Sequence, residues 1–173
     1  MANIQRDKLI NYEVFKEGER KLGTADVSLP DIEYKSDTMK GAGIAGEVEM
    51  PTMGQTGPMP VTINWRTLNE DVTDLLGFKA HSLDFRGAQQ HYNAGTSEFT
   101  VQAVRVTVRA FPKKMAAGKF EGSNKTDSSN EMECVYLKIE IDGVKKIEID
   151  KLNYVHYVNG VDYLEAVRTA LGI

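Results

Sequence analysis

A regular alternation of apolar and polar residues is the feature that most constrains the fold of this chain. Val61, Ile63 and Trp65 are separated by single polar residues, and a second alternating run extends from Val135 to Asp142. Successive side chains of a β-strand point to opposite faces of the sheet, so a period of two predicts strands with one buried face. The sequence therefore predicts a mainly β fold.

Two long strands are predicted in the middle of the chain. They cover His81–Tyr92 and Glu98–Phe111, and a short turn rich in small polar residues joins them. In the second strand the apolar residues change from one face to the other near Ala103. We expect a bulge or sharp bend near Ala103, or different partner strands for the two halves.

A β-hairpin is predicted over Val135–Asp150. A two-residue loop would place Ile139 opposite Lys146 and mix the faces, whereas a three-residue loop over 142–144 matches the apolar and the charged faces together. The three-residue loop is therefore our prediction. The expected cross-strand pairs are Ile139–Ile147, Leu137–Ile149, Glu140–Lys146 and Lys138–Glu148.

Two short helices are predicted, one near 70–77 and one near 162–171. The first follows Asn69, a favourable N-cap residue, and ends at Gly77. The second begins at Asp162, with Glu165 in capping-box spacing, and ends at Gly172. Helices of this length are unstable alone, so we expect both to dock on a sheet.

The segment from Thr38 to Pro60 has an unusual composition. It holds five glycines and three of the five prolines of the chain, yet it also carries four methionines. We expect this long loop to lack regular structure and to become ordered by contacts with neighbouring subunits. The candidate interface residues are Met39, Gly41, Gly43, Ile44, Gly46, Val48, Met50, Met53 and Met59.

The motifs that could carry chemistry lack the context that the chemistry needs. Gly41–Gly46 matches the G-x-G-x-x-G dinucleotide pattern, but a polar segment precedes it and Pro51 follows, where a helix would have to run.

His81 and His91 share a strand face but are roughly 33 Å apart at about 3.3 Å per residue, too far for one metal ion. Cys134 is expected to be a small buried hydrophobe. We expect no catalytic, cofactor or metal site.

The bulk composition narrows the function classes further. The net charge of −4 at pH 7 is mild and argues against a domain whose main task is to grip nucleic acid. Bases concentrate between Arg105 and Lys119, where we expect a solvated strand face or a patch that faces an acidic neighbour. We find no signal peptide and no long apolar run, so we expect one soluble domain over 1–173, made in a cytoplasm.

Segments spread over nearly the whole chain resemble one known family. The most specific segment is Val158–Glu165 with Arg168 and Leu171–Ile173, and Asp142-Gly143 with Ile147–Asp150 adds to it. Matching residues near the start are Asn11–Phe15, Gly18, Gly23, Val27, Leu29-Pro30 and Gly41–Gly46. These segments are similar to the major tail tube proteins of contractile-tailed (myovirus-type) bacteriophages and R-type bacteriocins.

The resemblance implies a β-sandwich or partial-barrel subunit with a flanking helix, whose strands complete a ring-shaped β-barrel on oligomerisation. Hexameric rings would stack into the inner tube of a contractile tail, surrounded by a tail sheath protein. A tape measure protein would occupy the lumen, and DNA would pass through without specific binding. In a bacteriocin the same tube would puncture a membrane. The resemblance places the protein in a virion tail or bacteriocin particle, after assembly in the host cytoplasm.

Three alternatives remain open from the sequence. The first is the ring-forming tube component of a type VI secretion-like system, and the second is a baseplate component of a contractile tail. The third, from a different class, is a monomeric β-barrel that binds a small ligand. Such a barrel would stay monomeric at all concentrations and would enclose an apolar pocket.

Overall fold

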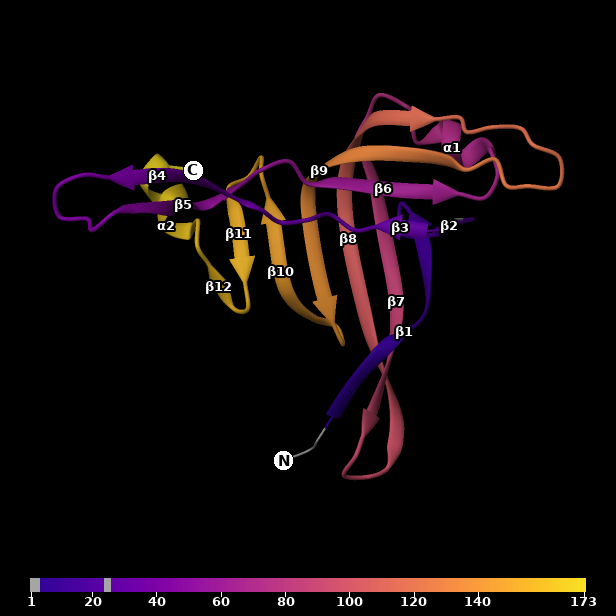
Figure 1. The fold of residues 1–173 in the computed structure, drawn as a ribbon, viewed down its shortest axis with the longest axis horizontal. Helices are drawn as coiled ribbons and strands as arrows, with labels where there is room; N and C mark the ends of the chain where they lie inside the picture. The colour runs from indigo at the N-terminus through magenta and orange to yellow at the C-terminus, as the bar shows by residue number, and fades with distance from the viewer. Residues whose placement is uncertain (1–3, 24–25) are drawn as a thin grey trace.

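The computed structural model describes residues 4–23 and 26–173. Within these residues the chain forms twelve strands and two short helices (Figure 1). The strands are β1 (Ile4–Lys16), β2 (Arg20–Leu22), β3 (Asp26–Ser28), β4 (Tyr34–Lys40), β5 (Glu47–Thr56), β6 (Pro60–Trp65), β7 (His81–Asn93), β8 (Glu98–Ala116), β9 (Ser128–Ile141), β10 (Val144–Asp150), β11 (Val155–Val158) and β12 (Val161–Asp162). The helices are α1 (Glu70–Asp74) and α2 (Glu165–Leu171). The prediction of a mainly β fold is confirmed.

Ten of the strands belong to one antiparallel sheet. Its main order is β12-β11-β10-β9-β8-β7-β1-β2, and β6 joins it through β9, with β3 beside β6. The other two strands, β4 and β5, pair only with each other. The body of the subunit is therefore a single strongly bent sheet with a separate hairpin attached.

The bend that folds the sheet onto itself lies in β9. Residues Ser128–Glu133 of β9 pair with β6, whereas β10 takes over this side from Tyr136 onward. The register against β8 shifts between Arg109 and Ala110, which leaves Val135 as the extra residue of a bulge. Because a bulge adds one residue, the buried side of β9 changes from Met132 and Cys134 to Leu137. The layer formed by β6 and β3 can then lie over β7 and β8.

The core fills the space between these two layers. The apolar face of β6, with Val61, Ile63 and Trp65, is 0–1% exposed and faces the inner residues of β1, β7 and β8. Trp65 Nε1 donates a hydrogen bond of 2.9 Å to Asn130 Oδ1, and Asn130 Nδ2 donates one of 3.1 Å to the Val72 carbonyl oxygen. This buried polar link ties α1 to β6 and β9, and all its polar groups are used.

The structure corrects the expectation of a bulge near Ala103. The β7–β8 pairing runs through Ala103 without a register shift, so that half of the prediction is wrong. The other half is confirmed, because β8 pairs with β9 only from Val104 onward. Asp142 ends the pairing there: its backbone N–H donates to the Ala103 carbonyl oxygen at 2.8 Å, and its carboxylate accepts from the Ala103 N–H at 3.0 Å.

The register of the β9–β10 hairpin is confirmed for most pairs and wrong for one. Ile147 lies opposite Ile139, with Ile149–Leu137 and Glu148–Lys138 as predicted. The loop, however, has two residues, Asp142 and Gly143, both at positive φ, and Glu140 pairs with Lys145. A bulge between Lys145 and Ile147 restores the apolar register. The sequence argument considered loop length alone, and a bulge achieves the same matching of faces.

The two helices form where expected, but both are shorter. Asn69 Oδ1 accepts a hydrogen bond from the Val72 N–H at 3.2 Å, which confirms the N-cap of α1. The helix α2 begins only at Glu165, and its N-cap residue Leu164 makes no side-chain cap bond, so the predicted capping box is absent. Gly172 ends α2 in the left-handed conformation as predicted. No residue of α2 is fully buried, so its docking is slight.

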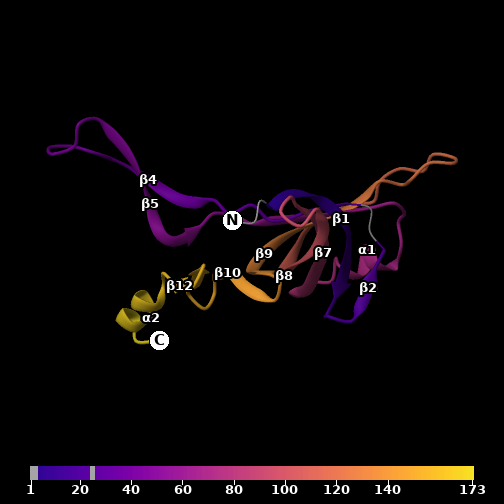
Figure 2. The same cartoon turned by 90° about the horizontal axis from the view of Figure 1, so that it is seen from below.

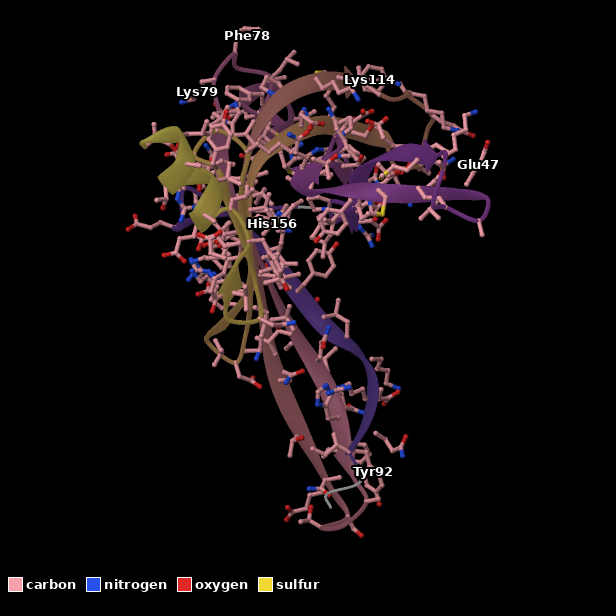
Figure 3. All side chains as sticks on the ribbon, turned by 90° about the vertical axis from the view of Figure 1, so that its left-hand side faces the viewer. Glu47, Phe78, Lys79, Tyr92, Lys114 and His156 are labelled. Carbon is pink, nitrogen blue, oxygen red and sulfur yellow. The ribbon has the colours of Figure 1, made fainter. Side chains whose placement is uncertain are left out.

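Two hairpins project from the body in different directions. The β4–β5 hairpin extends sideways (Figure 1). The far ends of β7 and β8, on either side of the turn between Asn93 and Glu98, extend downward, and β1 runs along them (Figure 1). We call this second projection the arm. Glu47 and Tyr92 lie near the far ends of these two projections (Figure 3). Each exposes surface far from the core.

Candidate assembly surfaces

The β4–β5 hairpin corrects the prediction of an irregular loop. Its strands pair from Lys40–Glu47 back to Ser36–Pro51, and most of its glycines lie outside this paired region. Gly41, Gly43 and Gly46 form the turn, all at positive φ. The composition thus reflects one glycine-rich turn and an irregular base, with a regular ladder of strand pairs between them.

The hairpin has one apolar face and one polar face. Met39 lies opposite Val48, and Met50 occupies the next position on the same face, where Asp37 at its margin lies opposite it. The three apolar side chains are 46–50% exposed. Lys40 and Glu47 lie on the opposite face and form an ion pair at 3.6 Å. An exposed apolar face on a projecting two-stranded hairpin is marginal alone, so it suits contact with another chain.

The remaining interface candidates occupy different environments. Met53 is 55% exposed and lies in the irregular part of β5 near the base of the hairpin. Ile44 is half-buried in the turn. Met59 is 0% exposed and belongs to the core cluster of the subunit. Met59 therefore offers no surface to a neighbour, and its inclusion among the interface candidates is wrong.

The base of the hairpin is fixed to the C-terminal segment. The Tyr34 hydroxyl lies 3.0 Å from Nε2 of His156, whose ring is 1% exposed. Gly54, at φ +68°, packs against Leu164 so closely that a Cβ atom there would lie 2.5 Å from the Leu164 side chain. Figure 2 shows the base of the hairpin next to the segment that leads into α2. These contacts set the direction in which the hairpin leaves the body.

His156 is electrostatically unusual at this base. Burial lowers the pKa of its imidazole, and the nearby Asp162 carboxylate opposes the shift only in part. Its Nδ1 atom is buried and makes no hydrogen bond within the described structure. His156 is therefore held as a neutral ring between Tyr34 and Tyr163. The sequence gives no sign of the contact between His156 and Tyr34, because these residues lie far apart along the chain.

The arm carries a second exposed apolar face. Tyr92 and Phe99 lie opposite each other with ring centroids 5.2 Å apart, and Val101 follows on the same face of β8. Phe99 and Val101 are 67% and 66% exposed. The sequence did contain a signal for this surface, because Phe99, Val101 and Ala103 lie on the face opposite to the core residues of β8.

The β1 edge is a third surface that can pair. The short strand β2 covers β1 only at Val14–Lys16, and β7 occupies the other side. Along Arg6–Asn11, no strand lies beside the outer edge of β1 among the residues that the structure describes. The opposite end of the sheet closes with the two-residue strand β12. A long open edge is a template for pairing with another chain.

The fold has two apolar pockets of modest size. The more enclosed has a volume of about 180 Å³ and is lined by residues such as Leu9, Leu29 and Val104, and the other, of about 350 Å³, lies at the base of the β4–β5 hairpin next to Met53 and His156. Residues 4–23 and 26–173 contain no group of three or more His, Cys, Asp or Glu side chains arranged to hold a metal ion. The same residues include no helix that is long and apolar enough to cross a bilayer.

The comparison with protein families decides the identity of the fold. The model of the family described as phage tail tube protein FII matches residues 6–172. The chain belongs to this family. The tail tube protein of Escherichia phage P2 is 28% identical over 183 aligned positions, which cover 100% of both chains. The protein is thus a structural tail tube component, and its family is not enzymatic.

One solved structure supports the same fold. The sheath/tube terminator of an extracellular contractile injection system (PVC) in its extended state superposes with a TM-score of 0.52 at 15% identity, over 76% of this chain and 94% of that one. A sheath-tube complex of the PVC system gives a TM-score of 0.48 at 16% identity, over 75% of this chain and 88% of that one.

Proposed function

We propose that six copies of this tail tube protein close into a ring, and that the rings stack into the inner tube of a contractile tail. Family membership supports the tube role. The subunit supplies three surfaces that a lone monomer leaves unsatisfied: the apolar face of the β4–β5 hairpin, the outer edge of β1 and the apolar face of the arm. We propose that the whole chain, 1–173, acts as one tube domain.

The hairpin is the proposed contact with an adjacent subunit. Ordering a backbone costs roughly 1–2 kcal/mol per residue, and the hairpin buries almost none of its own surface to offset this cost. Met39, Val48, Met50 and Met53 supply adaptable apolar surface for the contact. Ile44 and the turn glycines Gly41, Gly43 and Gly46 complete the proposed interface. Their lack of nearby atoms leaves room for a close approach by another chain.

The sheet edges are the proposed lateral contact. The outer edge of β1 would pair with the β10–β12 end of the next subunit, so that the sheets join around the ring. Backbone pairing of this kind satisfies the edge groups without any special side chain. Only a closed ring of subunits pairs every sheet edge in this way, because an open row of subunits would leave one edge unpaired at each end.

The proposed partners follow from the tube arrangement. A tail sheath protein would surround the tube, consistent with the sheath/tube terminator that shares this fold. A tape measure protein would occupy the lumen, and DNA would pass through it without specific binding. The protein would assemble in the host cytoplasm and end in a virion tail, or in a bacteriocin particle whose tube punctures a membrane.

A monomeric ligand-binding barrel is disfavoured by the lack of a large enclosed cavity. The most enclosed apolar pocket has only about 180 Å³, and the apolar pocket of about 350 Å³ next to Tyr34, Met53 and His156, although within the roughly 300–1,000 Å³ of ligand sites, is more open to solvent. The curved sheet also keeps an open edge at β1, whereas a ligand barrel closes on itself.

Sedimentation and negative-stain electron microscopy of the purified protein over a range of concentrations test the proposal. We expect rings or striated tubes to appear as the concentration rises, with sixfold symmetry in end views. A protein that stays monomeric at every concentration, or that forms only irregular aggregates, would contradict the proposal.

A further inference from the structure

The exposed methionines of the described chain all lie in one projecting element. Met39, Met50 and Met53 are about half exposed, and all three belong to the β4–β5 hairpin, which extends from the body of the subunit (Figure 1). In the body itself, Met59 and Met132 are fully buried in the core. The thioether sulfur atoms are thus divided between an exposed hairpin and a closed core.

The thiol of the chain does not compete with these sulfur atoms for an oxidant. Cys134, the single cysteine, is fully buried, and burial raises the pKa of its thiol to about 12. Peroxides react with the thiolate form, so Cys134 is protected both by burial and by its bound proton. The hairpin methionines are therefore the first sulfur atoms that a soluble oxidant meets.

An oxygen atom added to Met39 or Met50 would lie on the apolar face of the hairpin. Met39 lies opposite Val48, and Met50 follows two positions further along β5 on the same face. Met53 lies apart from them at the base, where it lines the pocket next to His156. Oxidation of the first two residues therefore changes the face that we assign to the contact with another subunit.

We propose that the β4–β5 hairpin is an oxidation site, at which hydrogen peroxide converts Met39, Met50 and Met53 to methionine sulfoxide and so blocks assembly. This inference rests on the proposed function. In each reaction the sulfur gives an electron pair to one peroxide oxygen, the O–O bond breaks and an S=O bond forms. The other oxygen leaves as water and takes both peroxide protons. The sulfur is oxidised by two electrons, and the peroxide is reduced by two.

The sulfoxide blocks assembly without unfolding the subunit. In the free subunit its oxygen faces water, so the folded state keeps its stability. A neighbouring subunit that covers the apolar face removes this water and leaves the oxygen without a hydrogen-bond donor. One such oxygen should raise the protein concentration needed for tubes by roughly tenfold. The change is reversible, because methionine sulfoxide reductases, one for each epimer, restore the thioether.

Peptide mapping by mass spectrometry locates the oxidised residues. Free subunits and assembled tubes would receive the same dose of hydrogen peroxide. In the free subunit we expect an added oxygen on Met39, Met50 and Met53, while Met59 and Met132 stay unmodified. In tubes, Met39 and Met50 should be protected. Oxidation of Met59 or Met132 as early as Met39 in the free subunit, or equal oxidation of Met39 in both states, would overturn the inference.

Assembly of oxidised subunits, after removal of the peroxide, tests the consequence. Oxidised wild-type protein should unfold at the same temperature as untreated protein but form no tubes at the concentration where untreated protein does. Treatment with both reductases should restore the tubes.

Leucine variants supply the matched controls. Met39→Leu/Met50→Leu/Met53→Leu keeps apolar side chains of similar volume, so it should form tubes before and after peroxide treatment. Met115→Leu changes a partly buried residue that packs against the core and leaves the hairpin methionines in place. It should lose tubes after peroxide treatment as the wild type does.

Three outcomes of the assembly experiment would overturn the inference. They are normal tubes from oxidised wild-type protein, a lowered unfolding temperature that shows general damage, and a loss of tubes that the reductases do not reverse. An equal loss of tubes on oxidation of the triple leucine variant would have the same meaning. Untreated wild-type protein that forms no tubes would instead contradict the proposed function, so the two failures are distinguishable.

Discussion

At the scale of single residues, Gly54 illustrates a position where only glycine fits. It combines φ +68° with close contact to the Leu164 side chain. We predict that Gly54→Ala lowers the free energy of unfolding by the backbone cost of roughly 1–2 kcal/mol plus an overpacking cost of roughly 1–3 kcal/mol. Thermal or denaturant unfolding of the free subunit measures the loss.

Gly143→Ala is the matched control for this prediction. Its φ of +76° is similar, but no atom lies within 4 Å of the added Cβ position. Gly143→Ala should therefore show the backbone cost alone, and Leu164→Ala in the Gly54→Ala background should recover part of the extra loss. Equal losses for the two glycine variants would show that the contact with Leu164 is unimportant.

The neutral state of His156 gives a prediction on pH. Because burial lowers the pKa of His156 in the folded state, the unfolded chain binds a proton below about pH 6.5 that the folded chain does not. The free energy of unfolding should therefore fall as pH decreases through 6.5, against the partial opposition of Asp162. A titration of stability from pH 8 to pH 5 should show a shallower fall for His156→Gln than for the wild type. Parallel curves would refute this assignment.

Single residues were predictable where local pattern decides their environment. Cys134 is buried as expected, because alternation along a strand shows which residues point inward. Met59 was misassigned, because loop composition does not show where the chain re-enters the core. The contacts of Gly54 with Leu164 and of Tyr34 with His156 join residues more than 100 positions apart, and no local pattern reveals such pairs.

At the scale of elements, the β4–β5 hairpin carries the clearest prediction. The double variant Met39→Ser/Met50→Ser should leave the stability of the free subunit within roughly 0.5 kcal/mol of wild type, because both side chains are about half exposed in it. The same variant should lose tube formation, because it makes the apolar face of the hairpin polar. Unfolding curves and electron microscopy measure the two effects separately.

The opposite face of the hairpin provides the control. Thr38→Ser/Glu49→Gln changes two residues paired across the polar face. It should leave both stability and tube formation unchanged. Normal tubes from the methionine variant would show that the apolar face of the hairpin is not an assembly contact.

The elements themselves were predictable, and their irregularities were not. Alternation and capping residues located the long strands, the β9–β10 hairpin and α1. The bulges at Val135 and next to Lys146 depend on which strand pairs with which, so they arise from contacts distant in the sequence. The apolar residues of β8 change face near Ala103 for the same reason: β9 pairs with β8 only from Val104 onward, and no bulge is needed there.

At the scale of the whole molecule, the sequence resemblance indicated the family, and the family comparison confirms it. The resemblance could not show the two projecting hairpins, because their directions depend on contacts between residues far apart in the sequence. The account now makes one joint claim. The hairpin, the outer edge of β1 and the arm are all covered when subunits assemble.

Amide hydrogen exchange, compared between the free subunit and the assembled tube, tests this claim most directly. We predict fast exchange in the free subunit and strong protection in the tube for the β4–β5 hairpin, for Arg6–Asn11 of β1 and for the tip of the arm. The core strands β6 and β9 should be protected in both states. Strong protection of the hairpin and the β1 edge in a verified monomer, or no gain in protection on assembly, would contradict the account.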